Sequence, residues 1–567
     1  MKNSPLTVNL VLRASGLLLL ILGVGLYCYW IRELTLEFPR SDSYRHIVNF
    51  LMPNLSGNGI DLSAFWNNPH PKPVYGLLLY VNALWFGLDF RLEAGLYFAA
   101  GLLLLGLFAR LMASSRPAPG ISAAGFITLV LLFFNVGDGA HITWSLVTQI
   151  YFILLLVFVY YQLFISFTDR PRASMEAGFA AYQFVFFLIS FDEALLATAP
   201  LILYLLVRMF AARTERPMSA RILVYTSVSA ICSSLVISSM NSYAGTDNLT
   251  SRGLDNLLYF LGAPGDGFRF VAFSLAEPLV NHAYLARKLG LEQTWAIGAY
   301  AVSVCYVIIY LAALRTAFRD ATRVGRMCAL IMTFHLAFIA SVMLFRFEPE
   351  SQTVYFSLSP RYHLIHLFGW IAAATYFFTW CPALAGSFRR DRLILAGRTL
   401  MLLVVGTASV TYAIEFSGKS RFIQSNSNAT GISLLRVASG IDVRPVASWH
   451  CLNEAQCKQA LDVLRVHQLN LFSMRYNSRF SRACDAEVVN AEAFFRSNFI
   501  RLELSREDAY VDVTMNGQLV SLKSFGTEKL IRAPLKDMNE VKITLHCFRN
   551  YSRQSIGDLQ ISRSSGN

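Results

Sequence analysis

The sequence contains repeated apolar runs that are long enough to cross a lipid bilayer. The first is residues 8–30, and similar runs recur until about residue 415. A transmembrane helix needs about 20 apolar residues, because lipid cannot satisfy backbone polar groups. Only 15% of the residues are charged, against about 25% in soluble domains. The chain is therefore predicted to be a polytopic α-helical membrane protein, and its first run, too long for a signal peptide, is predicted to be retained.

The basic residues predict which loops face the cytoplasm. Lys and Arg lie mostly in short loops between apolar runs, as the positive-inside rule describes. The net charge of +13 therefore does not indicate nucleic-acid binding, because the basic residues form no continuous stripe. Assigning each basic loop to the cytoplasm gives about eleven crossings, with the N-terminus inside and the C-terminus outside. The predicted spans are approximately 8–30, 92–112, 121–140, 148–167, 177–192, 194–212, 221–240, 294–315, 327–346, 362–382 and 394–415.

Two apolar segments do not fit as crossings. Residues 73–88 are short, and a crossing there would place the basic "ARLMASSR" segment outside. Residues 271–289 are interrupted by Glu277, Asn281 and His282. Both segments are predicted to be interfacial or half-inserted helices.

The sequence changes character after residue 416. Segments such as "VKITLHC" alternate apolar and polar residues, with Val541, Ile543 and Leu545 on one face, which is typical of a strand. Asn516-Gly517 separates two such segments and predicts a hairpin turn. A helical pattern near 453–468 precedes the strands. Two domains are predicted: a membrane domain over 1–416 and an α+β, strand-rich extracytoplasmic domain over 417–567.

The cysteines divide between the two predicted domains. Four lie in the C-terminal one: Cys451, Cys457, Cys484 and Cys547. An even number in an external domain predicts two disulfides in an oxidising compartment. A zinc site is the alternative, although a Cys-x₅-Cys spacing is unusual for structural zinc. The other five lie in or beside apolar spans and are predicted to be packing residues: Cys28, Cys232, Cys305, Cys328 and Cys381.

The predicted outward loops carry an unusual set of ionisable and aromatic residues. Ionisable groups at membrane depth cost roughly 3 kcal/mol, so they usually face a cavity or a partner. A carboxylate there can activate an acceptor hydroxyl, and cations can hold a phosphate. The candidates are Asp42, Tyr44, Arg45, His46, His70, Lys72, Asp138, His141, Asp192, Glu193, Arg361, Tyr362 and His363.

Structural alternatives exist for several of these residues. Asp42 can be a helix cap or an ion-pair partner of Arg40 or Arg45. Asp192-Glu193 can be a turn at the water interface. Asp138 and His141 can belong to a metal site, but the spacing is more typical of a plain loop. His335, alone on an apolar helix, is predicted to be a buried histidine with its hydrogen bonds satisfied.

The order of short motifs resembles a family of membrane enzymes. An acidic residue soon after the first membrane helix, as in "SDSYRH" at 41–46, is similar to the GT-C superfamily of polyprenyl-phosphate-sugar-dependent glycosyltransferases. The segments "NNPHPKPVYGLL" at 67–78 and "SLSPRYHL" at 357–364 resemble elements of the bacterial serotype-converting (GtrII-like) O-antigen glucosyltransferases. The chain departs from their Asn-Glu-His-Arg element, where it reads Asn-Pro-His-Pro-Lys. The resemblance covers the membrane region and leaves the C-terminal domain unexplained.

The resemblance implies a function and a site. A single sugar would pass from a polyprenyl-phosphate donor to an extracytoplasmic acceptor, either a cell-surface glycan such as O-antigen or a protein such as pilin. Asp42 would be the catalytic base. The donor phosphate would be held by His70, Lys72 and Arg361, with Tyr362 or His46 shaping the sugar pocket. Some GT-C members need a divalent metal and others do not, so a metal stays open. The location implied is the bacterial inner membrane, with the C-terminal domain in the periplasm.

Two other functions remain open at this point. A transporter or flippase would show internal repeats and ionisable groups near the bilayer midplane. Neither feature is evident in the sequence. A ligase or polymerase of lipid-linked glycans would use pyrophosphate-linked oligosaccharides, and it would share the outward cations.

Overall fold

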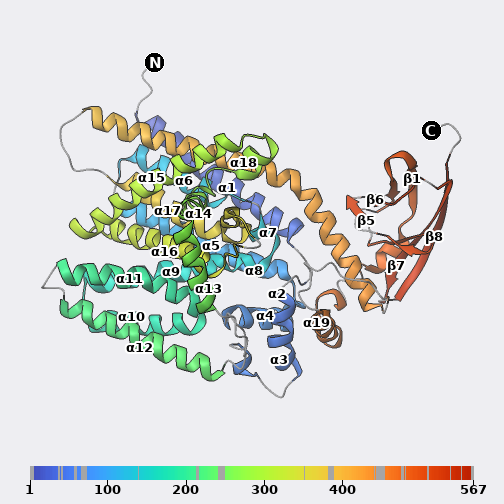
Figure 1. The fold of residues 1–567 in the computed structure, drawn as a ribbon, viewed down its shortest axis with the longest axis horizontal. Coiled ribbons are helices and arrows are strands. Elements are labelled where there is room, and N and C mark those ends of the chain that lie inside the picture. Colours follow the sequence, from blue (N-terminus) through green and yellow to red (C-terminus); the bar gives the residue numbers. More distant parts are fainter. Residues whose placement is uncertain are drawn as a thin grey trace. The chain divides into compact units, whose positions relative to one another are not determined.

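A computed structural model describes most of the chain as helices, with strands near the C-terminus (Figure 1). The described residues are 5–35, 39, 42–56, 60–65, 73–115, 117–137, 139–211, 216–240, 249–349, 352–380, 388–439, 441, 454–473, 478, 480–506, 510–520, 522–525, 527–536, 538–550 and 552–563. The chain divides into two compact units. The helical unit contains Met1–Ile31, Trp66–Val74 and Ala94–Phe416, and the mixed unit contains Arg32–Phe65, Tyr75–Glu93 and Ser417–Asn567.

The helical unit is built from long apolar helices. Its elements are α1 (Pro5–Leu34), α5 (Phe90–Ser114), α6 (Pro119–Phe133), α7 (Ala140–Thr143), α8 (Ser145–Thr148), α9 (Ile150–Asp169), α10 (Ala173–Ile189), α11 (Phe191–Ala211), α12 (Arg216–Met240), α13 (Leu249–Gly262), α14 (Pro264–Ala276), η4 (Ala283–Lys288), α15 (Glu292–Arg319), α16 (Arg323–Phe345), η5 (Val354–Leu358), η6 (Pro360–Tyr362), α17 (His363–Thr379) and the first part of α18 (Phe388–Ala438). Within the described residues, eight helices are long and apolar enough to cross a membrane. The prediction of a mostly helical chain with several helices of membrane length is confirmed, while the membrane crossings and their number stay predictions.

Helix α17 is the central helix of this unit. Nearly all of its side chains are buried, from His363 at its start to Phe378 near its end. It is apolar on every side, which is the pattern of a helix surrounded by other helices. Small residues let its neighbours approach closely: a Cβ atom on Gly369 would lie 2.1 Å from His335 Nδ1. Helices α6 and α16 pack directly against it.

The two predicted interfacial segments have different outcomes. Residues 73–88 form α4 (Pro73–Phe86), whose 14 residues are fewer than a bilayer span requires. The prediction of one helix over 271–289 is wrong. Helix α14 ends at Ala276, a turn follows, and the π-helical segment η4 begins at Ala283. Pro278 explains the break, because it has no N–H to continue the helical hydrogen bonds.

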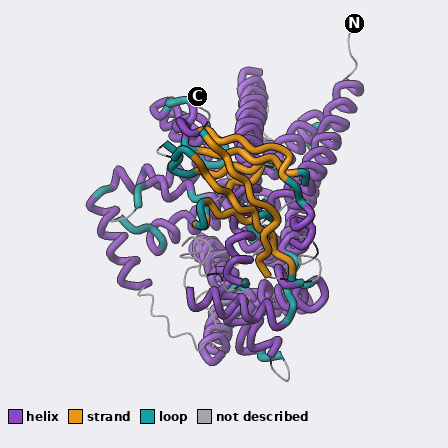
Figure 2. Tube along the Cα trace, turned by 90° about the vertical axis from the view of Figure 1, so that its right-hand side faces the viewer, coloured by secondary structure: helices purple, strands orange, loops and turns teal. Residues whose placement is uncertain are grey.

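The mixed unit contains short helices and two antiparallel sheets. Its helical elements are α2 (Asp42–His46), η1 (Ile47–Leu51), α3 (Met52–Ser56), η2 (Leu62–Phe65), α4, α19 (Glu454–Val466), η7 (Asn470–Phe472), η8 (Ala483–Asp485) and η9 (Phe495–Ser497). Its strands, orange in Figure 2, are β1 (Val488–Phe494), β2 (Phe499–Leu504), β3 (Asp512–Met515), β4 (Gln518–Leu519), β5 (Leu522–Phe525), β6 (Glu528–Arg532), β7 (Glu540–Arg549) and β8 (Ser552–Ser562). The strand orders are β1-β2-β6-β5 and β4-β3-β7-β8.

The strand and turn predictions for this region are confirmed. Val541, Ile543 and Leu545 lie in β7 and are buried, alternating with more exposed residues. Asn516 and Gly517 join β3 to β4 with φ of 49° and 79°. Met515 pairs with Gln518 across this two-residue turn. Positive φ at both positions is what a type I′ hairpin needs, and Asn-Gly supplies it with little strain.

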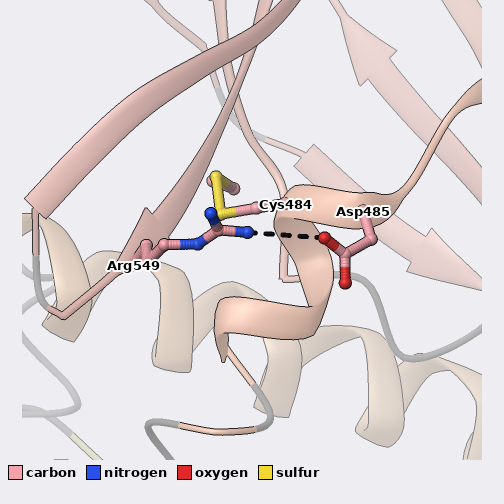
Figure 3. Close-up of a disulfide and its surroundings, with 4 residues drawn as sticks. Cys484, Asp485 and Arg549 are labelled. Atoms are coloured by element: carbon pink, nitrogen blue, oxygen red, sulfur yellow. Dashed lines mark hydrogen bonds and ion pairs between the residues drawn. A yellow bond between two sulfur atoms is a disulfide. The ribbon is translucent and has the colours of Figure 1, made fainter.

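The C-terminal strands are joined to a short helical turn by a disulfide. Cys484 in η8 is bonded to Cys547 in β7, beside an ion pair between Arg549 and Asp485 (Figure 3). Cys457 also lies in a disulfide, and Cys451 lies outside the described residues. The packing role predicted for the other cysteines is right for buried Cys328 but wrong for Cys28, Cys232 and Cys305, which are exposed. Cys381 lies outside the described residues.

Removing the Cys484–Cys547 bond should lower the stability of the strand region. The bond closes a loop of 63 residues, for which the chain-entropy model gives a contribution of about 4 kcal/mol. A Cys484→Ser/Cys547→Ser double variant should therefore unfold at clearly lower denaturant concentration, measured on the purified full chain. Cys232→Ser is the matched control and should leave the midpoint unchanged. An unchanged midpoint for the double variant would contradict the expectation.

Segments far apart in the sequence are joined inside the mixed unit. Helix α19 packs against α2 and η1, which follow the first long helix. Buried Asn470 donates from its backbone N–H to the Gly87 carbonyl at 2.7 Å, and from Nδ2 to the Leu88 carbonyl at 2.8 Å. Leu88 and Asn470 both have positive φ, at 63° and 49°. The two strained turns therefore hold each other through paired hydrogen bonds.

Candidate active site

A cavity of about 330 Å³ opens in the helical unit where α14 ends. Its size is at the lower end of the range for small-molecule sites. The walls come from the turn after α14, from η4, from the η5–η6 segment and from α18. The polar lining residues are Glu277, Asn281, His282, Arg287, Ser359 and Glu415, and the aromatic ones are Tyr355, Phe356 and Tyr412. The cavity thus combines carboxylates, a guanidinium and aromatic faces.

The end of α14 is held by side chains from four other elements. The last carbonyl groups of a helix have no partner within it and must be satisfied from elsewhere. Ala276 O accepts from the backbone N–H groups of Leu279 and Val280. Leu275 O and three carbonyl groups just after the helix accept from side chains. The pairs are Trp370 Nε1 to Leu275 O (2.6 Å), Tyr412 Oη to Glu277 O, Asn135 Nδ2 to Pro278 O (2.6 Å) and Trp295 Nε1 to Val280 O (3.1 Å). The backbone that carries Glu277 and Asn281 is therefore fixed before any ligand binds.

Glu277 forms a buried pair with His363. Both carboxylate oxygens lie 2.8 Å from His363 Nδ1, and the two side chains are almost fully buried. On its other side, His363 Nε2 lies 3.1 Å from the carbonyl oxygen of Asn135. His363 begins α17, and Glu277 follows the last residue of α14. The pair therefore joins two helix ends at the wall of the cavity.

The hydrogen-bond partners indicate how many protons this pair holds. Each ring nitrogen of His363 faces an oxygen, and a neutral imidazole has only one N–H. An ionised Glu277 beside a neutral His363 would leave one nitrogen lone pair facing an oxygen lone pair. One further proton removes that conflict, either on the imidazole or on the carboxyl group.

Residues of the segment "NVGDGAH" contact the Glu277–His363 pair. Asn135 is buried. Its side-chain Oδ1 accepts from the Gly137 N–H at 3.1 Å, and its backbone carbonyl faces His363. Gly137 has φ of 49°, and a Cβ atom there would lie 2.7 Å from the His363 ring. Gly139 has φ of 75°, and its Cβ would lie 1.9 Å from the Phe416 ring. Glycine is required at both positions, because the backbone has positive φ and a neighbouring ring leaves no room for a Cβ atom.

Gly139→Ala should destabilise the helical unit by about 2–5 kcal/mol. The cost combines positive φ for a residue with a Cβ atom and a clash with buried Phe416. Thermal unfolding of the purified protein would show a lower midpoint and reduced yield. Gly178→Ala is the control, because a Cβ there meets nothing within 4 Å and alanine is a better helix former. Equal stability of both variants would contradict the inference that Gly139 lies too close to Phe416 for a Cβ atom.

The other histidines near the pair are buried and uncharged. His141 Nε2 lies 3.0 Å from the Tyr27 hydroxyl, and its ring stacks on His363 at 5.7 Å. Burial and the neighbouring His363 hold the pKa of His141 well below its usual value. His335 is hydrogen-bonded to Tyr306 at 2.8 Å and to His366 at 2.9 Å, so the prediction of a satisfied buried histidine is confirmed. The described residues contain no group of three or more His, Cys, Asp or Glu side chains able to hold a metal.

Two side chains of the cavity wall each have a buried polar atom without a hydrogen-bond partner among the described residues. Asn281 is buried, and its Nδ2 has no hydrogen-bond partner among the described residues. The same holds for His282 Nε2. Burial and the charge of Arg287 lower the pKa of His282, so its ring is neutral near pH 7. Both residues line the cavity.

The structure places the predicted site residues in different settings. Asp42 is the first residue of α2, but its side chain lies outside the described residues, as do His70, Lys72 and Asp138. Tyr44 is buried, which raises its pKa, and His46 packs edge-on against Tyr75 at 4.8 Å; both lie in the mixed unit, as does half-buried Arg45. Arg361 and His363 lie in the helical unit.

Arg361 and Tyr362 are neighbours of the cavity rather than part of its lining. Arg361 is exposed and lies over the Tyr362 ring at 5.9 Å. Tyr362 packs against Phe338 and Phe356. Ser359 and Pro360, from the same "SLSPRYHL" segment, do line the cavity. The segment therefore contributes to the cavity wall, while Arg361 is not one of the lining residues.

Asp192 and Glu193 lie in the first turn of α11, and neither lines the cavity described above. Ser190 Oγ donates to Glu193 Oε2 at 2.8 Å. Acidic residues in a first turn are favoured by the helix dipole. A pocket role for this pair stays a prediction.

Sequence reasoning missed most of the cavity. Glu277, Asn281 and His282 were noted only as interruptions of an apolar segment. Arg287, Glu415 and Tyr412 gave no signal. The Glu-Pro step at 277–278 was the available clue, because it places a carboxylate where a helix must stop.

Comparison with protein-family models, with curated proteins and with solved structures finds no match to this chain.

Proposed function

We propose that the chain is a membrane glycosyltransferase of the GT-C type, which transfers one sugar from a polyprenyl-phosphate donor to an extracytoplasmic acceptor. The observation that carries the proposal is the cavity itself. The "SLSPRYHL" segment, one of the motifs behind the resemblance, supplies one of its walls, and the buried Glu277–His363 pair and Arg287 supply others. A phosphorylated sugar needs this combination of a cation, hydroxyl partners and aromatic faces.

The reaction assigns a role to each group. The acceptor hydroxyl oxygen attacks the anomeric carbon, the bond from that carbon to the phosphate oxygen breaks, and polyprenyl phosphate leaves. On the family resemblance alone, we assign the role of base, which takes the hydroxyl proton, to Asp42. Arg287 stabilises the charge that develops on the phosphate, with Lys72, His70 and Arg361 as further cations from the sequence.

The sugar is recognised by the remaining wall of the cavity. Tyr355 and Tyr412 offer ring faces, and Asn281 offers an unpaired N–H₂ group. Glu277 either accepts from a sugar hydroxyl or, through its shared proton, donates to the leaving phosphate. In the proposed cellular setting the protein lies in the bacterial inner membrane with its C-terminal strands in the periplasm. The acceptor there is a glycan or a protein.

A transfer assay with defined donors tests this proposal. The purified full-length protein is incubated with a polyprenyl-phospho-monosaccharide, and release of polyprenyl phosphate is measured. Turnover in the presence of an acceptor fraction supports the proposal. Turnover with only pyrophosphate-linked oligosaccharide would instead identify a ligase. Movement of an unreacted donor across vesicles, without release of polyprenyl phosphate, would identify a flippase.

A further inference from the structure

A second cavity, of about 200 Å³, lies in the helical unit between α5, α9 and α16. Arg110 and Arg323 line it together with Gln162, and no acidic residue does. Apart from Ser114, the rest of the wall is apolar. It includes Leu107 and Leu111 from α5 and Phe158 from α9. The cavity therefore has a cationic part and a hydrocarbon part.

The two arginines carry positive charge that the described residues do not neutralise. Arg323 donates to the Ser166 hydroxyl at 3.2 Å rather than to a carboxylate. Arg110 has no ion-pair partner within the described part of the chain. The carboxylate at this end of α9, Asp169, is already bonded to Arg326. Both lining arginines are exposed, so an anion can reach them without unfolding.

The cavity lies where helices of membrane length begin or end. Arg110 is near the end of Phe90–Ser114, and Arg323 begins Arg323–Phe345. Segments η5 and η6, which line the candidate active site, follow the other end of α16. A 23-residue helix is about 35 Å long, close to the thickness of a bilayer core. The two cavities thus lie near opposite ends of α16, and a bilayer spanned by this helix would have its headgroups near the second cavity.

The geometry points to a binding site for the phosphate headgroup of an anionic phospholipid in this second cavity. The two guanidinium groups hold the phosphate, as arginine does wherever phosphate is recognised. One acyl chain packs along Leu107, Leu111 and Phe158. By the positive-inside rule this end of the bundle is cytoplasmic, where anionic headgroups attract basic residues. The site is separate from sugar transfer, and it does not depend on the proposed function.

Thermal unfolding of the purified full-length protein in neutral detergent tests the site. The probes are short-chain phosphatidylglycerol, short-chain phosphatidylcholine and inorganic phosphate. We expect phosphatidylglycerol to raise the unfolding temperature, with phosphatidylcholine and phosphate giving little change. In an Arg110→Gln/Arg323→Gln variant the half-maximal lipid concentration should rise about 30-fold, from the loss of two surface cations. Native mass spectrometry, counting retained lipids, gives an independent measurement.

Arg315→Gln/Arg319→Gln is the matched control. It removes the same charge from the same end of the bundle, but these arginines on α15 are exposed and do not line the cavity. This variant should bind phosphatidylglycerol as the unmodified protein does. Equal weakening by both double variants would overturn the site, because the effect would then be general surface charge. A full shift with inorganic phosphate alone would overturn the lipid assignment.

Discussion

Asp42→Asn is expected to abolish sugar transfer, with a loss of about 10²–10⁴-fold if a water molecule replaces the base. Asparagine keeps the shape of the side chain but cannot accept the acceptor's proton. The rate of polyprenyl phosphate release, measured at saturating donor, reports the loss directly. Expression and membrane insertion should be near normal, because the substitution adds no volume.

Asp61→Asn is the control for this experiment. Asp61 is exposed in the same loop region, where it accepts from the Ser63 backbone N–H at 2.9 Å and from its hydroxyl at 2.7 Å. The hydroxyl contact is the main reason that the pKa of Asp61 is low. This variant removes the same charge and should keep at least half of the activity. Normal turnover by the Asp42 variant would refute the assignment of the base.

Glu277→Gln is expected to reduce transfer by about 10²-fold or more. Glutamine fills the same space and can still hydrogen-bond to His363, but it cannot ionise or share the extra proton of the pair. The donor site would then lose either a charge or a proton donor at its wall. The same release assay should show a lower maximal rate.

Glu176→Gln is the matched control for Glu277. Glu176 forms an ion pair with Arg221, but both belong to the α10–α12 pair and neither lines the cavity. Its replacement should leave the rate unchanged. If Glu277→Gln behaved in the same way, the cavity would not be the donor site, whatever the outcome for Asp42.

Elements with a strong local pattern could be predicted from the sequence. The long apolar runs predicted helices, and the alternation at Val541, Ile543 and Leu545 predicted β7. Both predictions were possible because the spacing of apolar residues follows the face that is buried. Asn516-Gly517 fixed a turn for a local reason as well. In each case the decisive interaction lies within a few residues along the chain.

The cavity depended on contacts between distant residues, so local patterns could not reveal it. His363 was singled out for its neighbours in sequence, yet its partner Glu277 is 86 residues away. Asn135 is 228 residues from His363, although its carbonyl faces the imidazole. A lone acid in an apolar segment shows that a partner exists, but only the fold shows which one. The break after Ala276 was missed for a similar reason, because hydropathy does not register the missing N–H of Pro278.

The junction of Asn470 with Gly87 and Leu88 bears on how the C-terminal region should be studied. Deleting everything after residue 416 would remove the amide that caps this turn, together with the helix that supports the segment beginning at Asp42. An inactive shortened protein would then say nothing about acceptor recognition. Substitutions confined to the outer faces of β1 and β8 would alter the strands while leaving the hydrogen bonds of Asn470 to Gly87 and Leu88 in place.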